Sequence, residues 1–310
     1  MAKNRQLRLR TAQDIDQRIA RVLEGLGNPE PPLNLVIVRE LLKLDRVFYT
    51  ADDPNLMQEV VSRIRVATIQ VFKRPTLLLD AIKKLSLQAL YIPDQKRILL
   101  DQNLPTKKHR WNEAHEIGHS LLPWHEDMML GDTALTISQD CHEQIEAEAN
   151  YAAGRLLFLR ERFVVEAKDC SPNILSIQNL RNTFGNTLST TFYRFIEAAG
   201  DERPMVGLMT EHPHPSRRSD DFDILNPCRH FIRSPAFASR FDRITEFDLF
   251  TSVEGYCADK RGGPLGATEL MLTDDNGSEH RFYFETFYNQ YDALTLGVYI
   301  DEKPLSISLA

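Results

Sequence analysis

The chain has 310 residues, of which 42% are hydrophobic and 26% are charged, and its formal net charge is -7. This is the composition of an ordinary globular protein, and the length favours two domains over one. The negative charge argues against a protein whose main task is to coat nucleic acid, and no apolar run approaches the length that crosses a membrane.

The start of the chain and the cysteines indicate the compartment. The basic residues 1–10 are followed by no apolar core, so they predict neither a secretory signal nor an anchor. The cysteines are far apart and form no Cys-x-x-Cys pair, which favours free thiols over a disulfide framework. We therefore expect a cytoplasmic protein with no membrane partner.

The N-terminal part is predicted to be helical. Apolar residues at three- and four-residue steps predict helices over 11–26 and 33–44. Two further helices are predicted from Pro54 to about residue 71 and from Thr76 to Leu85. We expect these helices to form a cap on the unit that follows. After them, the strands 89–92 and 97–100 flank a polar turn and predict a β-hairpin.

The stretch 111–122 contains His-Glu-Ile-Gly-His in an apolar frame that predicts an amphipathic helix. His115 and His119 lie one turn apart on the same face, where two imidazoles can bind one Zn²⁺. Zinc lowers the pKa of a bound water to about 7, and Glu116 can take its proton. Gly118 leaves room beneath for another backbone or side chain. The alternative is two solvated histidines on an ordinary helix.

A zinc site needs a third protein ligand, and His125 is one candidate. It lies six residues after His119, the spacing of the third histidine in HExxHxxGxxH enzymes. In those enzymes a glycine turns the chain sharply, whereas this chain has Leu122 at that position. Leucine resists the left-handed backbone that such a turn can require. The alternative interpretation of His125 is a loop histidine near the mouth of the site.

The better candidate is Glu146, on a helix predicted over 145–157. Together with the two histidines it would complete the His₂Glu set of zinc peptidases. Asn150 lies one turn further on, where its side chain can hydrogen-bond a ligand histidine and fix its tautomer. Small residues make this helix thin on one side, which allows close approach to the helix with the histidines. Glu148 is a fallback ligand, but it faces elsewhere if Glu146 and Asn150 face the metal.

The two motifs together resemble the ImmA/IrrE family of zinc metallopeptidases over roughly residues 85 to 200. The resemblance implies His115, His119 and Glu146 as ligands and Glu116 as general base. It also implies an intracellular, zincin-like enzyme, and the characterised members cleave helix-turn-helix transcriptional repressors. Two departures affect no ligand. The family's Arg-Phe-Thr-Leu-Ala run is Arg-Trp-Asn-Glu-Ala at 110–114, and its Leu-Leu-Met-Pro ending is Leu-Leu-Phe-Leu at 156–159.

The surroundings of the catalytic helix carry further expectations. In zincin-like enzymes a strand before this helix commonly lies along the cleft, so we expect 97–101 to pair with an extended substrate. The alternative is a fully paired interior strand. The loop 125–144 is predicted to overhang the cleft as a flexible lid or specificity loop. An electrophilic side chain should stabilise the oxyanion, and the residues left as candidates are Tyr151, His142, His125 and Arg110.

Residues 174–195 look like two short helices around Gly185, an arrangement that resembles a helix-turn-helix. The segment carries only two basic residues, so packing or protein docking is favoured over direct DNA binding. From about residue 202 the segments 246–256, 268–273, 280–287 and 295–300 alternate apolar and polar residues in part. A turn at 274–277 favours a hairpin, so this part is predicted to be a small antiparallel sheet of unknown role.

The sequence thus predicts an α+β fold in three parts. Residues 1–160 form a zincin-like metallopeptidase core with an N-terminal helical cap, 161–201 a helical helix-turn-helix-like connector, and 202–310 an antiparallel β-rich domain. The predicted activity is zinc-dependent endopeptidase cleavage of a protein, by resemblance a transcriptional repressor, in stress response or mobile-element regulation. The alternative is a non-catalytic, metal-stabilised regulator that binds DNA or a repressor.

Overall fold

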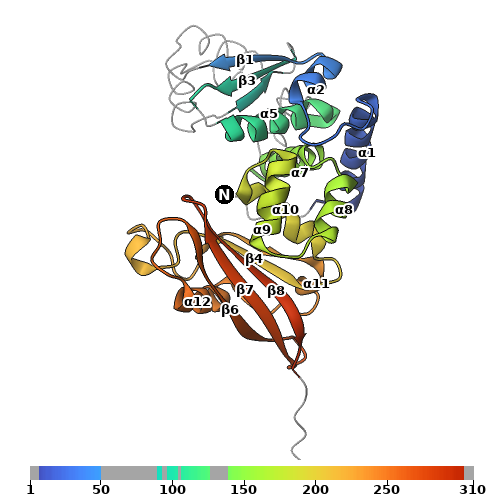
Figure 1. Cartoon of the computed structure of the whole chain (residues 1–310). Helices are drawn as coiled ribbons and strands as arrows, with labels where there is room; N and C mark the ends of the chain where they lie inside the picture. Colours follow the sequence, from blue (N-terminus) through green and yellow to red (C-terminus); the bar gives the residue numbers. More distant parts are fainter. Residues whose placement is uncertain (1–6, 50–88, 93–95, 104–105, 126–138, 304–310) are drawn as a thin grey trace, which may run out of the picture. The chain divides into compact units, whose positions relative to one another are not determined.

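The computed structural model describes residues 7–49, 89–92, 96–103, 106–125 and 139–303 (Figure 1). The chain divides into two compact units. Unit 1 comprises residues 1–160 and 184–186, and unit 2 comprises 161–183 and 187–310. Most of the segment 161–201, which the sequence analysis set apart as a connector, therefore lies in unit 2.

Unit 1 combines helices with a small sheet. The two predicted N-terminal helices are confirmed as α1 and α2, whereas the helices predicted between 54 and 85 and the lid over 126–138 lie outside the described residues. In chain order the elements are α1 (Leu9–Gly25), α2 (Leu35–Leu42), β1 (Asp45–Tyr49), β2 (Ala89–Ile92), β3 (Arg97–Asp101), α5 (Thr106–Leu121) and α7 (Gln139–Leu157).

The sheet of unit 1 has the order β1-β3-β2. The predicted hairpin is confirmed, because β2 pairs antiparallel with β3. The expectation that Arg97–Asp101 is the edge strand is wrong, because β1 pairs with β3 in parallel on its other side. The unbroken apolar run Ile98-Leu99-Leu100 is buried, as is typical of an interior strand. Among the described strands, β1 and β2 therefore form the two edges of this sheet.

The helices α5 and α7 pack closely through small residues. Ala149, Ala152 and Ala153 of α7 are fully buried. A Cβ atom on Gly118 of α5 would lie 2.9 Å from the carbonyl oxygen of Ala149 and 3.2 Å from the Cβ of Ala152. The expected space at Gly118 is thus filled by the backbone of α7, and any side chain there would push the two helices apart.

We expect Gly118→Ala to destabilise unit 1 by about 1–3 kcal/mol, because the added methyl group overpacks the contact with α7. Gly255 on a helix of unit 2 is a matched control, since nothing lies within 4 Å of its Cβ position. Gly255→Ala should be neutral or stabilising by up to about 1 kcal/mol through helix propensity. Denaturation followed by circular dichroism reports on both units, and the fluorescence of Trp111 and Trp124 reports on unit 1. Equal effects of the two substitutions would contradict the packing argument.

The N-terminal elements hold α5 and α7 through ion pairs. The buried carboxylate of Glu113 on α5 accepts from Arg39 on α2 at 2.5 Å and from Arg46 on β1 at 2.8 Å. On the other helix, Arg155 of α7 donates to Asp16 of α1 at 2.5 Å. Ion pairs therefore attach α5 to α2 and β1, and α7 to α1.

Unit 2 contains an antiparallel sheet with the order β5-β4-β8-β7-β6. The turn predicted at 274–277 joins β6 and β7, and Gly277 adopts φ +91° within it. The elements in chain order are α8 (Glu161–Asp169), α9 (Ile174–Phe184), α10 (Leu188–Ala199), β4 (Met205–Thr210), η3 (Pro215–Arg217), β5 (Cys228–Arg233), α11 (Pro235–Ala238), α12 (Glu246–Tyr256), β6 (Gly263–Thr273), β7 (Glu279–Tyr288) and β8 (Ala293–Glu302).

One prediction for unit 2 is wrong, because residues 246–256 form the helix α12 and not a strand. A capping box starts it: the side chain of Thr245 accepts from the backbone of Asp248, whose carboxylate accepts from the backbone of Thr245. Leu249, Phe250 and Val253 then lie on one buried face at helical spacing. Leu249 and Phe250 belong to the apolar core that the sheet forms with Phe237 and Phe241.

The helix pair α9 and α10 surrounds a turn at Gly185, as the sequence predicts. Within unit 2, Phe192 and Ile196 of α10 pack against Gly207 of β4. Every residue of α10 is buried or half-buried. Within the described ranges, none of the helices has the length and apolar character that crossing a membrane requires.

Candidate metal site

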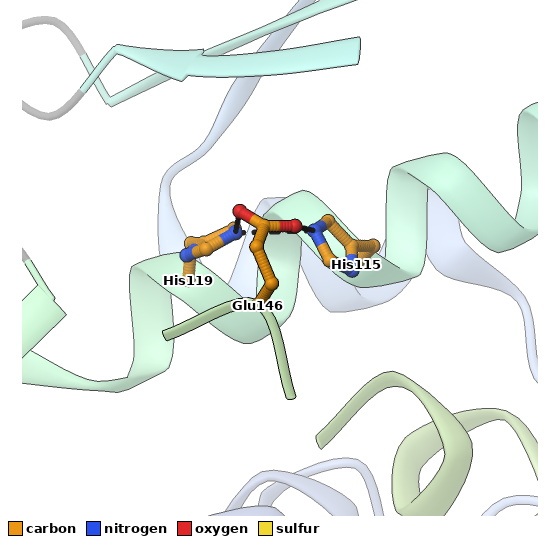
Figure 2. Close-up of side chains that lie close together, drawn as sticks. All are labelled: His115, His119 and Glu146. Atoms are coloured by element: carbon orange, nitrogen blue, oxygen red, sulfur yellow. Dashed lines mark hydrogen bonds and ion pairs between the residues drawn. The ribbon is translucent and has the colours of Figure 1, made fainter. Parts of the chain in front are cut away.

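Three side chains that could hold a metal converge between α5 and α7 (Figure 2). His115 and His119 project from the same face of α5, and the Glu146 carboxylate of α7 lies between their rings. The Nε2 atoms of the histidines are 3.1 Å apart, and Glu146 oxygens lie 3.2 Å from Nε2 of His115 and 3.6 Å from Nε2 of His119. The sequence analysis named these three residues as ligands, and the structure brings them together.

These distances fit a tetrahedral zinc site. Zinc binds nitrogen and oxygen at about 2.0–2.2 Å, so neighbouring ligands of a tetrahedron are separated by about 3.3–3.5 Å. The separations of 3.1, 3.2 and 3.6 Å bracket that value without any movement of the helices. Three protein ligands leave a fourth position open, which is the pattern of a catalytic site and not of a closed structural one.

The electrostatics of the three residues also suit a cation. Burial lowers the pKa of His119 to about 4, so this imidazole is neutral, as a ligand must be. Burial opposes the charge of Glu146, but hydrogen bonds with both histidines outweigh it and hold its pKa well below its ordinary value. Burial also opposes protonation of His115, yet the pairing with Glu146 outweighs it and raises that pKa.

Asn150 occupies the position proposed for it. Its Oδ1 lies 3.1 Å from Nδ1 of His115, one turn along α7 from Glu146. An amide oxygen can only accept, so Nδ1 of His115 carries the hydrogen and Nε2 keeps its lone pair facing Glu146 and His119. The spacing of Glu146 and Asn150 thus places one group among the metal-binding atoms and the other behind a histidine.

Glu116 lies beside the three residues and is buried. Burial raises its pKa to about 7, with the charge of His115 opposing and that of Glu146 adding to this shift. Its carboxylate also accepts a hydrogen bond from the backbone of Tyr91 on β2. A carboxylate with this pKa can take and return a proton near neutral pH. The same contact places the outer edge of β2 next to Glu116.

The interpretation of His125 as a loop histidine needs correction, whereas Glu148 faces other neighbours, as expected. His125 is not a loop histidine at the mouth of the site, because its side chain is fully buried and its Nδ1 lies 2.9 Å from Nδ1 of His119. Its Nε2 lies 2.9 Å from Glu148, which faces away from Glu146. Burial opposes the charge of Glu148, but hydrogen bonds from His125, Trp124 and Gln144 outweigh it and lower its pKa. The alternation of Glu146 and Glu148 along α7 was the available signal, since it directs the two carboxylates to different neighbours.

The other candidates for oxyanion stabilisation bond elsewhere. The Tyr151 hydroxyl donates to Asp16 on α1 at 3.1 Å. The Arg110 guanidinium donates to the carbonyl of Leu33 at 2.7 Å, and burial lowers its pKa. The side chain of His142 lies outside the described residues. These hydrogen bonds of Tyr151 and Arg110 therefore run to α1 and to the Leu33 carbonyl.

Comparison with known proteins agrees with this geometry. Residues 67–195 match the model of the Peptidase M78 family, described as the IrrE N-terminal-like domain. A solved structure of a Mycobacterium tuberculosis transcriptional regulator superposes with a TM-score of 0.52 at 15% identity, over 93% of this chain and 76% of that chain. At this identity the likeness concerns the fold alone. The search of curated proteins gave no significant match. Residues 67–195 of the chain therefore resemble the IrrE N-terminal-like domain of the ImmA/IrrE metallopeptidase family.

Proposed function

We propose that this protein is a zinc-dependent endopeptidase that cuts a peptide bond in a protein substrate. The observation that carries the proposal is the convergence of His115, His119 and Glu146 with ligand atoms within 4.8 Å of one another, beside the buried carboxylate of Glu116. Zinc held there would act as a Lewis acid that polarises the scissile carbonyl and makes water acidic.

Glu116 would act as the general base, a role that the metal ligands cannot perform. Its carboxylate is placed to accept a proton from the attacking water and to deliver it to the leaving amine. A structural metal site has no use for a base at this position, so Glu116 favours an enzyme over a metal-stabilised regulator.

The edge of β2 supports an extended peptide as the substrate. β2 pairs with β3 on one side, and the backbone of Tyr91 contacts Glu116 on the other. A peptide that adds to this edge as another strand would pass directly by the Glu116 carboxylate. We assign this role to β2 in place of β3, which is paired on both sides.

The substrate class rests on family resemblance. The characterised relatives cleave helix-turn-helix repressors, and the superposed structure is named a transcriptional regulator. We propose a cytoplasmic repressor as the substrate, with a role in stress response or mobile-element regulation. The alternative is a non-catalytic regulator that binds a repressor. Direct binding to DNA is disfavoured by the packing of α10 against β4.

Zinc content and proteolysis together test the proposal. Protein purified without chelator should contain about one zinc per chain, because the site supplies three ligands and an open position. Incubation with helix-turn-helix repressors encoded beside the gene should give discrete fragments by mass spectrometry, and chelation should abolish them. Absence of bound metal in the native protein would overturn both the enzyme and the metal-stabilised regulator.

A further inference from the structure

We propose that His125 and Glu148 form a positioning pair that sets the orientation and the tautomer of the ligand His119. The inference rests on the proposed zinc site and assigns a role to two buried groups that the peptidase chemistry does not use. The contacts form one chain, in which Glu148 bonds His125, His125 bonds His119, and His119 faces the other metal-binding atoms.

Glu148 is the first member of this series of hydrogen bonds, and all three of its described neighbours donate to it. Trp124 Nε1 donates to Oε2 at 2.7 Å, and Gln144 Nε2 donates to Oε1 at 2.9 Å. The third neighbour is Nε2 of His125, at 2.9 Å from Oε2. An ionised carboxylate only accepts, so this nitrogen of His125 must carry a hydrogen. The exposed fraction of Glu148 is 2%, which leaves no room for water to substitute for these partners.

The hydrogen on Nε2 of His125 determines which of the other ring nitrogens donate and which accept. In a neutral imidazole one nitrogen donates and the other accepts, so Nδ1 of His125 accepts. Its partner at 2.9 Å is Nδ1 of His119, which therefore donates. Nε2 of His119 is then left with its lone pair, and it faces His115 and Glu146. The tautomers that Glu148 imposes on His125 and His119 therefore leave Nε2 of His119 unprotonated, as a zinc ligand must be.

The two ligand histidines are thus supported in different ways. His115 is held by the Asn150 amide, on the exposed side of the site. His119 is held by a buried charge that acts through a second imidazole, with His125 fully inaccessible to solvent. Hydrogen bonds of this kind fix the ring and raise its basicity toward the metal, and their loss typically weakens metal binding about 10–100-fold. His125 and Glu148 act through His119 and touch neither metal nor substrate.

Zinc affinity of the metal-free full-length chain, measured by competition with a chromogenic chelator, tests the pair directly. Glu148→Gln keeps the size of the side chain but places an amide among three donors, and it should weaken zinc binding by about 10-fold or more. His125→Phe keeps an aromatic ring but removes both nitrogens, and it should weaken zinc binding more than Glu148→Gln does. His125→Asn retains an acceptor near Nδ1 and should recover part of the affinity. The absorption bands of the cobalt-loaded variants should shift as well, which mere loss of stability would not cause.

The control is Asp16→Asn, which disturbs α7 through Arg155 on its other side and does not touch the chain of histidines. It should lower thermal stability without changing zinc affinity. If wild type binds no zinc, the proposed function fails. If wild type binds zinc and the folded Glu148→Gln and His125→Phe variants bind it equally tightly, the proposed function stands and the positioning pair is refuted.

Discussion

Glu116→Gln should keep its zinc and lose peptidase activity by about 100-fold or more, the usual range for a lost general base. The substitution preserves the size of a buried side chain and removes the proton acceptor. The ligand atoms come from His115, His119 and Glu146, so metal content should stay as in wild type. The measurement is the rate of substrate cleavage, together with zinc content from elemental analysis of the same sample.

The same variant separates an enzyme from a binder. A protein that regulates by association alone would bind its repressor and support cellular output equally well with glutamine at position 116. Full output from Glu116→Gln would therefore refute the peptidase proposal even if zinc were present. Lost output with retained zinc and retained repressor binding is the result that we expect.

Glu146→Ala should reduce the zinc content from about one per chain to near zero, because two imidazoles alone rarely hold zinc in a protein. The carboxylate also supplies the negative charge of the ligand set, and its oxygens lie 3.2 and 3.6 Å from the two histidine nitrogens. Zinc retained after dialysis against a weak chelator is the measurement. The apparent pKa of His115 should also fall, because Glu146 is its largest favourable partner against burial.

Glu143→Ala is the matched control for this loss, since it removes the same charge from the same helix outside the ligand set. It should leave the zinc content unchanged. His125 provides the second comparison, because its removal should weaken binding without abolishing it. If His125→Ala lost all zinc and Glu146→Ala kept it, the chain would belong with the HExxHxxGxxH enzymes.

Much of the site could be predicted because it depends on spacing within helices. Positions i and i+4 share a face whatever the tertiary structure, and this placed His115 with His119 and Glu146 with Asn150. The support behind His119 could not be predicted in the same way. His125 follows the end of α5 and its partner Glu148 lies on α7, so their contact depends on how two distant segments pack.

The fold shows the same division. Helices and the hairpin turn carry local signals, and α1, α2 and the turn at 274–277 were predicted within a few residues. The pairing of β3 with β1 has no local sequence signal, because β1 lies far before β3 in the sequence. The strand prediction for 246–256 failed because partial alternation was given more weight than the capping signal Thr245–Asp248.

The ion pairs at Asp16, Arg39 and Arg46 connect the segment that matches the family to residues that precede it in the chain. The family match begins at residue 67. The elements α1, α2 and β1 precede it and form ion pairs with the two helices that carry the proposed ligands. The match also ends at 195, inside α10 and well within unit 2. The two helices that carry the metal-binding residues therefore form ion pairs with elements outside the matched segment. A shortened protein for zinc-binding measurements should therefore retain α1, α2 and β1 together with the matched segment.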